Sequence, residues 1–272
     1  MKLYTIAEAA ALPIPPWIVP GWVRERTLTM LTAPGGVGKS NTATAIGVCA
    51  AAGIPFLEGE APERPARVLH VAIDAASWDH GHLARRIAAG LGVNPSDLDG
   101  EDDSGGYWFC FEPLLLQDGR FEEVINSVAY SSGAVPDLII IDSLRNIHDK
   151  DEDSSSEMMP VMRFFRRWAE KNCGIVLLHH TKKPSGVRAA WDWDTARGSS
   201  ALHNSVDAHI VLLPPRARRR PLQGRKLVEA VWVKGRGGDD TPSIKYRTTW
   251  NQDEMRFVRV KRGRPPGAPK EA

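Results

Sequence analysis

Short apolar runs alternate with amphipathic stretches through most of the chain. The runs are nearly unbroken, which is typical of strands buried on both faces of a parallel sheet. They lie at residues 28–33, 67–73, 107–111, 137–142 and 174–180. Between them, apolar positions recur at helical spacing, as in 157–172, where Val161, Phe164, Phe165 and Trp168 share one face. The other stretches that predict helices are 39–52, 81–92 and 120–130.

The pattern changes after about residue 206, where short strands of alternating character follow one another. They lie near 208–213, 227–234, 243–249 and 255–260. Strands that alternate with helices favour a mostly parallel sheet covered on both faces, and the late strands would extend it as antiparallel hairpins. We therefore expect one α/β domain over residues 28–260, an irregular Pro-rich lead-in over 1–27 and a disordered basic tail over 261–272.

The segment APGGVGKS at residues 33–40 stands between the first predicted strand and the first predicted helix. Glycines let the backbone turn successive N–H groups inward around phosphates, and the helix N-terminus adds positive potential. Lys39 would then reach the outer phosphates of a nucleotide such as ATP, and Ser40 would bind Mg²⁺. Ala33 replaces the usual first glycine, which is a small change. The residues expected to hold the nucleotide are Pro34, Gly35, Gly36, Val37, Gly38, Lys39, Ser40 and Asn41.

Two further strands end in an acidic residue, at the edge where open α/β sheets bind their ligands. Asp142 follows the apolar run 138–141, an arrangement in which the carboxylate orients Mg²⁺ together with Ser40. Asp74 ends the strand at 67–73 and is a candidate general base for an attacking water. The alternative for Asp74 is a turn or a helix cap, a role for which Asp79 competes.

His179 and His180 end the strand at 174–180. Strand alternation points them to opposite faces, so we expect only one imidazole to face the terminal phosphate and to sense it. The alternative is that packing and loop backbone satisfy both rings. Metal ligation is not expected, because no cysteine or carboxylate stands at ligand spacing.

The stretch after these histidines interleaves basic residues with Trp191 and Trp193. Lys182, Lys183 and Arg188 would track the phosphates of single-stranded DNA while the indole rings stack on bases. The alternative is that both rings pack the loop onto the body of the protein.

The composition is that of an ordinary globular protein, with 42% hydrophobic and 25% charged residues among 272. The three cysteines lie far apart in apolar settings, which favours reduced thiols and a cytoplasmic location. No apolar run is long enough to span a membrane, and the N-terminus does not have the pattern of a secretory signal. We therefore expect no membrane partner.

The net charge of +2 is unevenly distributed along the chain. Residues 216–272 hold 16 Lys or Arg against 6 Asp or Glu, which favours a polyanionic partner. Within them, KRGRPP at 261–266 resembles the core of an AT-hook, whose Arg-Gly-Arg fits the minor groove of A·T-rich duplex DNA. A generic basic tail is the alternative.

In combination and in this order, the motifs resemble the RepA family of hexameric plasmid and phage replicative helicases, within the RecA-like ATPases. The resemblance covers about residues 15–260. Its marks are the Pro-rich lead-in with its tryptophans, APGGVGKS, Asp74, LIIIDSL, LLHHTKK, RGSSAL and VKGRGG. It implies a RecA-like P-loop core, a homo-hexamer, and ATP hydrolysis coupled to movement along single-stranded DNA.

The resemblance also implies roles for individual residues. RecA-like motors carry a basic finger into the ATP site of the neighbouring subunit. Arg236 and Lys234 match that position, and Arg197 is a second candidate. By family position, His180 resembles the phosphate sensor and His179 its neighbour.

Two departures from the family pattern leave other functions open. Asp74 stands where the family usually has Glu, and Asp207 stands near a position that commonly carries arginine. Both departures favour slow hydrolysis. One alternative is a recombination mediator of the RadA type, which binds DNA without unwinding it. The other is a nucleotide-gated DNA-binding or loading protein with weak turnover.

Overall fold

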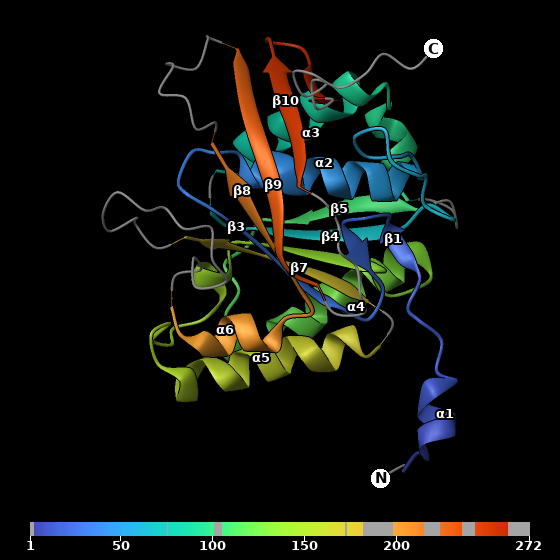
Figure 1. The fold of residues 1–272 in the computed structure, drawn as a ribbon. Coiled ribbons are helices and arrows are strands. Elements are labelled where there is room, and N and C mark those ends of the chain that lie inside the picture. Colours follow the sequence, from blue (N-terminus) through green and yellow to red (C-terminus); the bar gives the residue numbers. More distant parts are fainter. Residues whose placement is uncertain are drawn as a thin grey trace, which may run out of the picture.

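A nine-stranded sheet forms the centre of the computed structural model (Figure 1). The structure describes residues 3–74, 76–100, 105–171, 173–181, 198–214, 224–235 and 243–260. The order of strands across the sheet is β11-β10-β9-β8-β3-β7-β6-β4-β5. Their bounds are β3 (Leu28–Ala33), β4 (Arg67–Ala72), β5 (Gly106–Cys110), β6 (Leu138–Asp142), β7 (Gly174–His180), β8 (Ala208–Leu213), β9 (Arg225–Gly235), β10 (Ile244–Trp250) and β11 (Met255–Arg259).

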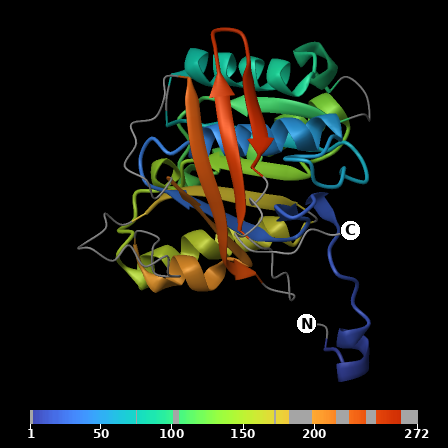
Figure 2. The same ribbon diagram turned by 45° about the horizontal axis from the view of Figure 1, so that its top comes forward.

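The sheet has a parallel part and an antiparallel part. Strands β8, β3, β7, β6, β4 and β5 run parallel, so their carboxyl ends share one edge. Strands β9, β10 and β11 extend the sheet as antiparallel neighbours, as the late alternating pattern predicts. Figure 2 shows these three strands crossing the front of the molecule. The predicted fold class, a mostly parallel sheet with antiparallel strands at its C-terminal end, is confirmed.

Helices cover both faces of the sheet (Figure 1). Helices α2 (Lys39–Ala52) and α3 (Ser77–Leu91) lie on one face. Helices α4 (Arg120–Ser132), α5 (Ser155–Ala169) and α6 (Ser200–Ser205) lie on the other. Each face encloses its own buried apolar cluster, because both sides of the central strands are apolar. Among the described residues, no helix combines the length and apolar character needed to cross a membrane.

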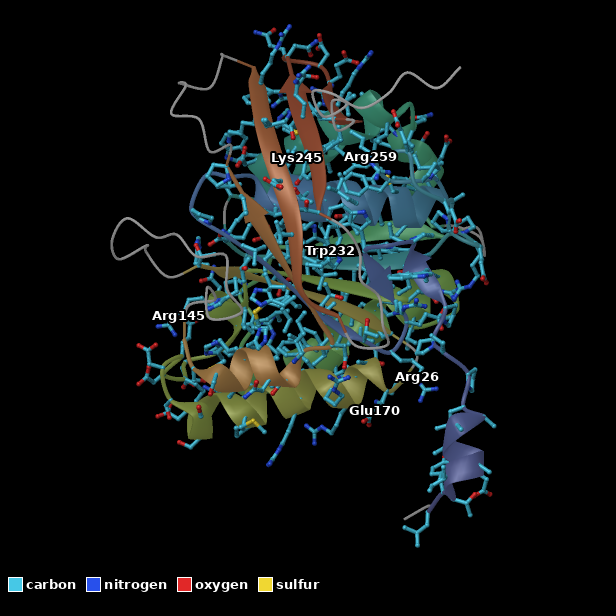
Figure 3. The ribbon with its side chains drawn as sticks, in the orientation of Figure 1. Arg26, Arg145, Glu170, Trp232, Lys245 and Arg259 are labelled. Carbon is cyan, nitrogen blue, oxygen red and sulfur yellow. The ribbon has the colours of Figure 1, made fainter. Side chains whose placement is uncertain are left out.

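The lead-in is more ordered than the sequence predicts. It holds a short helix, α1 (Ile6–Ala10), and a two-stranded sheet of β1 (Trp17–Val19) and β2 (Val23–Arg24). A capping box between Thr5 and Glu8 starts the helix. The Trp22 ring packs edge-on against Phe56 and against Trp232 of β9, each at 5.0 Å between ring centroids. Trp232 lies near the centre of the molecule in Figure 3, so the lead-in is anchored to the middle of the domain.

Most predicted element boundaries agree with the structure to within a few residues, and two elements differ more. Helix α3 begins at Ser77 rather than at residue 81, because its first turn is polar and carries no apolar periodicity. Helix α6 falls in a segment expected to be a loop, and its six residues are too few for a periodic signal.

Candidate nucleotide-binding site

The loop between β3 and α2 has the backbone geometry that phosphate binding requires. All six residues of β3 are buried, which fixes the start of the loop. Gly36 and Gly38 have φ angles of 75° and 116°, in the left-handed region that glycine adopts without steric cost. No side chain caps the first turn of α2, so its backbone N–H groups face the loop and an anion there.

Lys39 is held at the mouth of this loop. Its side chain is buried, and Nζ lies 3.4 Å from the Ala33 carbonyl oxygen and 3.2 Å from Nδ1 of His180. Burial lowers the pKa of Lys39, whereas the carboxylates of Asp142 and Asp74 raise it and favour the charged ammonium. A cation held between two acidic groups in a desolvated position is suited to bind phosphate oxygens.

Asp142 ends β6 beside the start of α2. Its side chain is 1% exposed and is hydrogen-bonded by the Ser40 side chain. Burial raises the pKa of Asp142, and Ser40, His80 and Lys39 oppose that shift. Oδ2 of this carboxylate is buried without a hydrogen-bond partner in the described part of the chain. A hydroxyl and a carboxylate oxygen are hard ligands, so Ser40 and Asp142 fit a Mg²⁺ ion.

Asp74 lies just beyond β4, at the same edge of the sheet. It is exposed, and Oδ1 accepts a hydrogen bond of 3.0 Å from Nδ2 of Asn146. Asn146 belongs to the short 3₁₀ helix Leu144–Ile147 that follows β6, so two strand ends cooperate in holding this carboxylate. An exposed and oriented carboxylate is able to accept a proton from water.

We expect Asp74→Asn to lower ATP turnover by roughly 10²-fold or more, the usual scale for loss of a general base. Asp74→Glu should keep turnover or raise it, because the longer side chain extends the reach of the carboxylate. Steady-state phosphate release measures both. Asp79→Asn, which changes an exposed acid in the first turn of α3, is the matched control. If Asp74→Asn stays within about twofold of wild type, below the range for general-base loss, Asp74 is a turn residue.

The two histidines at the end of β7 have different surroundings. His180 lies beside Lys39, and the ammonium donates to its Nδ1. The ring proton of a neutral His180 is therefore on Nε2. His179 is buried, with Nδ1 3.7 Å from Oε1 of the buried Glu152. Only His180 thus lies next to a residue of the phosphate loop.

Lys226, at the start of β9, is a site residue that sequence reasoning missed. Its Nζ donates a hydrogen bond of 2.7 Å to the carbonyl oxygen of Gly36 in the phosphate loop, and it lies 5.7 Å from the Trp250 ring centroid. A pocket of about 300 Å³ opens beside it. Its lining residues are Gly224, Arg225, Thr249, Trp250, Asn251 and Glu254. No motif marks Lys226, because the contact depends on the register of an antiparallel strand distant in sequence.

We expect Lys226→Met to weaken ATP binding by about fivefold, since a hydrogen bond contributes roughly 1 kcal/mol and its loss frees the loop backbone. Equilibrium titration with a fluorescent ATP analogue measures this change in Kd. Lys245→Met is the matched control, because Lys245 lies on the neighbouring strand β10 and contacts Glu229 at 3.5 Å. Figure 3 shows Lys245 on the upper part of these strands. An unchanged Kd for Lys226→Met would leave this contact without a role in binding.

Lys234 lies at the opposite edge of the sheet from the phosphate loop. Strand β9 is antiparallel to β8, with Gly235 opposite Ala208 and Glu229 opposite Leu213. Nζ of Lys234 donates to the carbonyl oxygen of His203, at 2.7 Å, at the end of α6. The structure therefore does not bring Lys234 to the site of its own subunit.

Several predicted residues lie outside the part of the chain that the structure describes. They are the finger candidates Arg236 and Arg197 and the proposed DNA contacts Lys182, Lys183 and Arg188.

Asp207, one of the departures from the family pattern, has a local structural role. Its Oδ2 accepts hydrogen bonds from Nη1 of Arg166 at 2.7 Å and from the backbone N–H of Leu28 at 2.9 Å. The carboxylate therefore ties α5 to the first residue of β3, at the edge of the sheet away from the phosphate loop.

Comparisons with known proteins agree with this geometry. A family model described as an AAA domain matches residues 2–186, which include the phosphate loop and the ends of β4, β6 and β7. Among solved structures, the fold resembles the ATPase domain of a phage helicase, with a TM-score of 0.61 and 14% sequence identity. That match covers 87% of this chain and 86% of the other. At this identity, the likeness is one of fold.

Proposed function

Because this chain belongs to the AAA domain family, we propose that it is an ATP-hydrolysing, ring-forming motor on single-stranded DNA, of the plasmid or phage replicative helicase type. One observation carries the ATPase part of the proposal. Lys39, Asp142, Asp74 and His180 converge at the carboxyl ends of four adjacent parallel strands, around a glycine-rich loop. This convergence is the arrangement that phosphoryl transfer requires.

Each side chain has a chemical task in this proposal. Backbone N–H groups of the loop and the Lys39 ammonium bind the phosphates of ATP. Ser40 and Asp142 hold Mg²⁺, which neutralises charge on the phosphate oxygens. Asp74, held by Asn146, accepts the proton of the attacking water. His180, whose Nδ1 accepts from Lys39, reports the terminal phosphate because phosphate oxygens compete for the same ammonium.

The geometry of β9 supports a ring of subunits. Residue Gly235 lies near the amino ends of the parallel strands, on the order of 17 Å from their carboxyl ends at 3.3–3.4 Å per residue. A finger at Lys234 or Arg236 therefore has to act on the phosphate loop of another subunit. RecA-like assembly as a hexamer would supply that neighbour.

The N-terminal arm, residues 3–14, also supports contacts between subunits. None of the α1 residues is buried, and Figures 1 and 2 show this helix standing away from the rest of the domain. The arm nevertheless carries large exposed apolar side chains, which normally mark an interaction surface. They are Leu3, Ile6, Leu12 and Ile14.

Single-stranded DNA is proposed as the track because the sequence offers basic residues and tryptophans together. Lys182, Lys183 and Arg188 would contact the DNA phosphates, and the basic tail at 261–272 would contact A·T-rich duplex. The excess of positive charge after residue 216 supports a polyanionic partner for this part of the chain.

The decisive test measures three properties of the full-length chain with and without an oligo-dT strand: ATPase rate, native mass and displacement of a strand from a forked duplex. The proposal expects DNA-stimulated hydrolysis, a hexameric mass and strand displacement. ATP-dependent DNA binding without displacement would favour a mediator of the RadA type. DNA binding gated by nucleotide with almost no turnover would favour a loading protein. Failure to bind ATP would overturn all three.

A further inference from the structure

His70 lies directly behind Asp142, inside the sheet. It belongs to β4, pairs with Ile140 of the neighbouring strand β6, and is fully buried. Its Nδ1 is 2.7 Å from the hydroxyl oxygen of Tyr107, and its Nε2 is 3.9 Å from Oδ2 of Asp142. The imidazole therefore connects a phenol on β5 with the carboxylate at the end of β6.

Two polar atoms that face each other here have no hydrogen-bond partner among the described residues. They are Nε2 of His70 and Oδ2 of Asp142, and both are buried. The ring nitrogens of the buried His80 are in the same condition, with its ring 5.8 Å from that of His70. Buried polar groups are nearly always hydrogen-bonded, and an exception calls for an explanation. The pairing of a ring N–H with a carboxylate oxygen supplies one for the first two atoms.

The protonation of this chain of groups sets its direction. Burial lowers the pKa of His70 to about 3, so the ring is neutral and carries one proton. Burial raises the pKa of Tyr107, so its phenol keeps its proton and is able to donate to Nδ1. The His70 proton is then on Nε2, facing the carboxylate. The other tautomer would place a nitrogen lone pair against the negative oxygen and is disfavoured.

Helix α2 is shaped to admit the tyrosine. A Cβ atom at Gly47 would lie 2.6 Å from a ring carbon of Tyr107 and 2.9 Å from Ile140, both closer than real contacts allow. Glycine inside a helix costs about 1 kcal/mol relative to alanine. The phenol therefore occupies a space that the helix provides at a cost to its own stability.

We propose that His70 is a positioning residue for Asp142: its Nε2–H, oriented by Tyr107, donates to Oδ2 and turns the other carboxylate oxygen toward Ser40. The inference rests on the proposed function, in which Ser40 and Asp142 hold Mg²⁺. The 3.9 Å separation is longer than a hydrogen bond. The carboxylate torsion is soft, so a movement of about 1 Å closes the gap when the site is filled.

Two substitutions of His70 separate positioning from packing. His70→Phe keeps an aromatic ring against Phe109, on which His70 stacks at 5.1 Å, but removes both ring nitrogens. His70→Gln loses that stacking but keeps an amide N–H near the position of Nε2. A positioning role predicts that His70→Phe is the more damaged variant at the metal-dependent step, and a packing role predicts the reverse.

The readout is the Kd of a fluorescent, non-hydrolysable ATP analogue, measured in EDTA and in Mg²⁺, together with kcat. For His70→Phe we expect an unchanged Kd in EDTA, and a 10- to 100-fold loss in the Mg²⁺-dependent gain in affinity or in kcat, the scale for outer-shell partners of a metal ligand. His70→Gln should retain most of the gain. Tyr107→Phe should lose part of it, because the ring tautomer is no longer fixed.

Tyr246→Phe is the matched control. Tyr246 is also fully buried, and its hydroxyl lies 2.7 Å from Oγ1 of Thr42 on α2, away from Asp142. If Mg²⁺ does not tighten binding to the wild type, the proposed function fails rather than this inference. If it does, a full Mg²⁺ gain in His70→Phe overturns the role of His70. Should His70→Phe not fold, the comparison of Tyr107→Phe with Tyr246→Phe decides, and equal behaviour of the two overturns the role.

Discussion

Replacement of Lys39 by alanine is expected to abolish ATP hydrolysis and to weaken nucleotide binding by about 10- to 100-fold, because hydrogen bonds to charged groups contribute roughly 1.5–3 kcal/mol. The expectation follows from the position of the ammonium, which is buried at the loop mouth beside His180. Alanine leaves the glycine turns and the start of α2 in place but removes the cation. Titration with a fluorescent ATP analogue and a phosphate-release assay measure the two effects.

Asp142→Asn is the informative companion to this variant. The amide is nearly the same size as the buried carboxylate but lacks its charge, so ATP should still bind while turnover stops. Thermal unfolding of both variants shows whether the fold is intact. Hydrolysis close to wild type in either variant would refute the assignment of this edge of the sheet as the catalytic site.

The sequence predicted the parts of the site that depend on local order. The glycine loop, the acids that follow apolar runs and the paired histidines are each readable because a buried strand delivers its next residue to one edge of the sheet. Asp74 and Asp142 come together for this reason, since β4 and β6 are neighbours with Ala72 opposite Asp142. The parallel core could be predicted on the same grounds.

The contacts of Lys226 and His70 could not be predicted in this way. Lys226 is one of many basic residues in the C-terminal part of the chain, and only the antiparallel register of β9 brings it to Gly36. His70 sits in an otherwise apolar strand and reads as a packed core residue. Its connection from Tyr107 to Asp142 needs three strands to be adjacent, β5, β4 and β6, and a sequence does not state that order.

The second large effect concerns the boundary between subunits. Arg236→Ala is expected to silence hydrolysis, by on the order of 10³-fold or more, while each subunit still binds ATP in its own phosphate loop. Positive charge is needed because negative charge spreads over the oxygens of the transferring phosphoryl group. The adjacent residues Lys234 and Gly235 lie at the edge of the sheet away from that loop, so the missing charge would be felt in the next subunit.

Mixing two inactive proteins tests this directly. Arg236→Ala subunits retain Lys39, and Lys39→Ala subunits retain Arg236, so a complete site forms wherever the two meet in the correct order. The mixture should recover part of the wild-type phosphate release, whereas each variant alone stays inactive. The gain should be modest, because every mixed ring also contains incomplete sites. Lys245→Met in place of Arg236→Ala serves as the control for a change of charge on the same group of strands. If Arg236→Ala is active alone, or if activity persists in a monomer, hydrolysis does not depend on a neighbouring subunit and the ring mechanism is wrong.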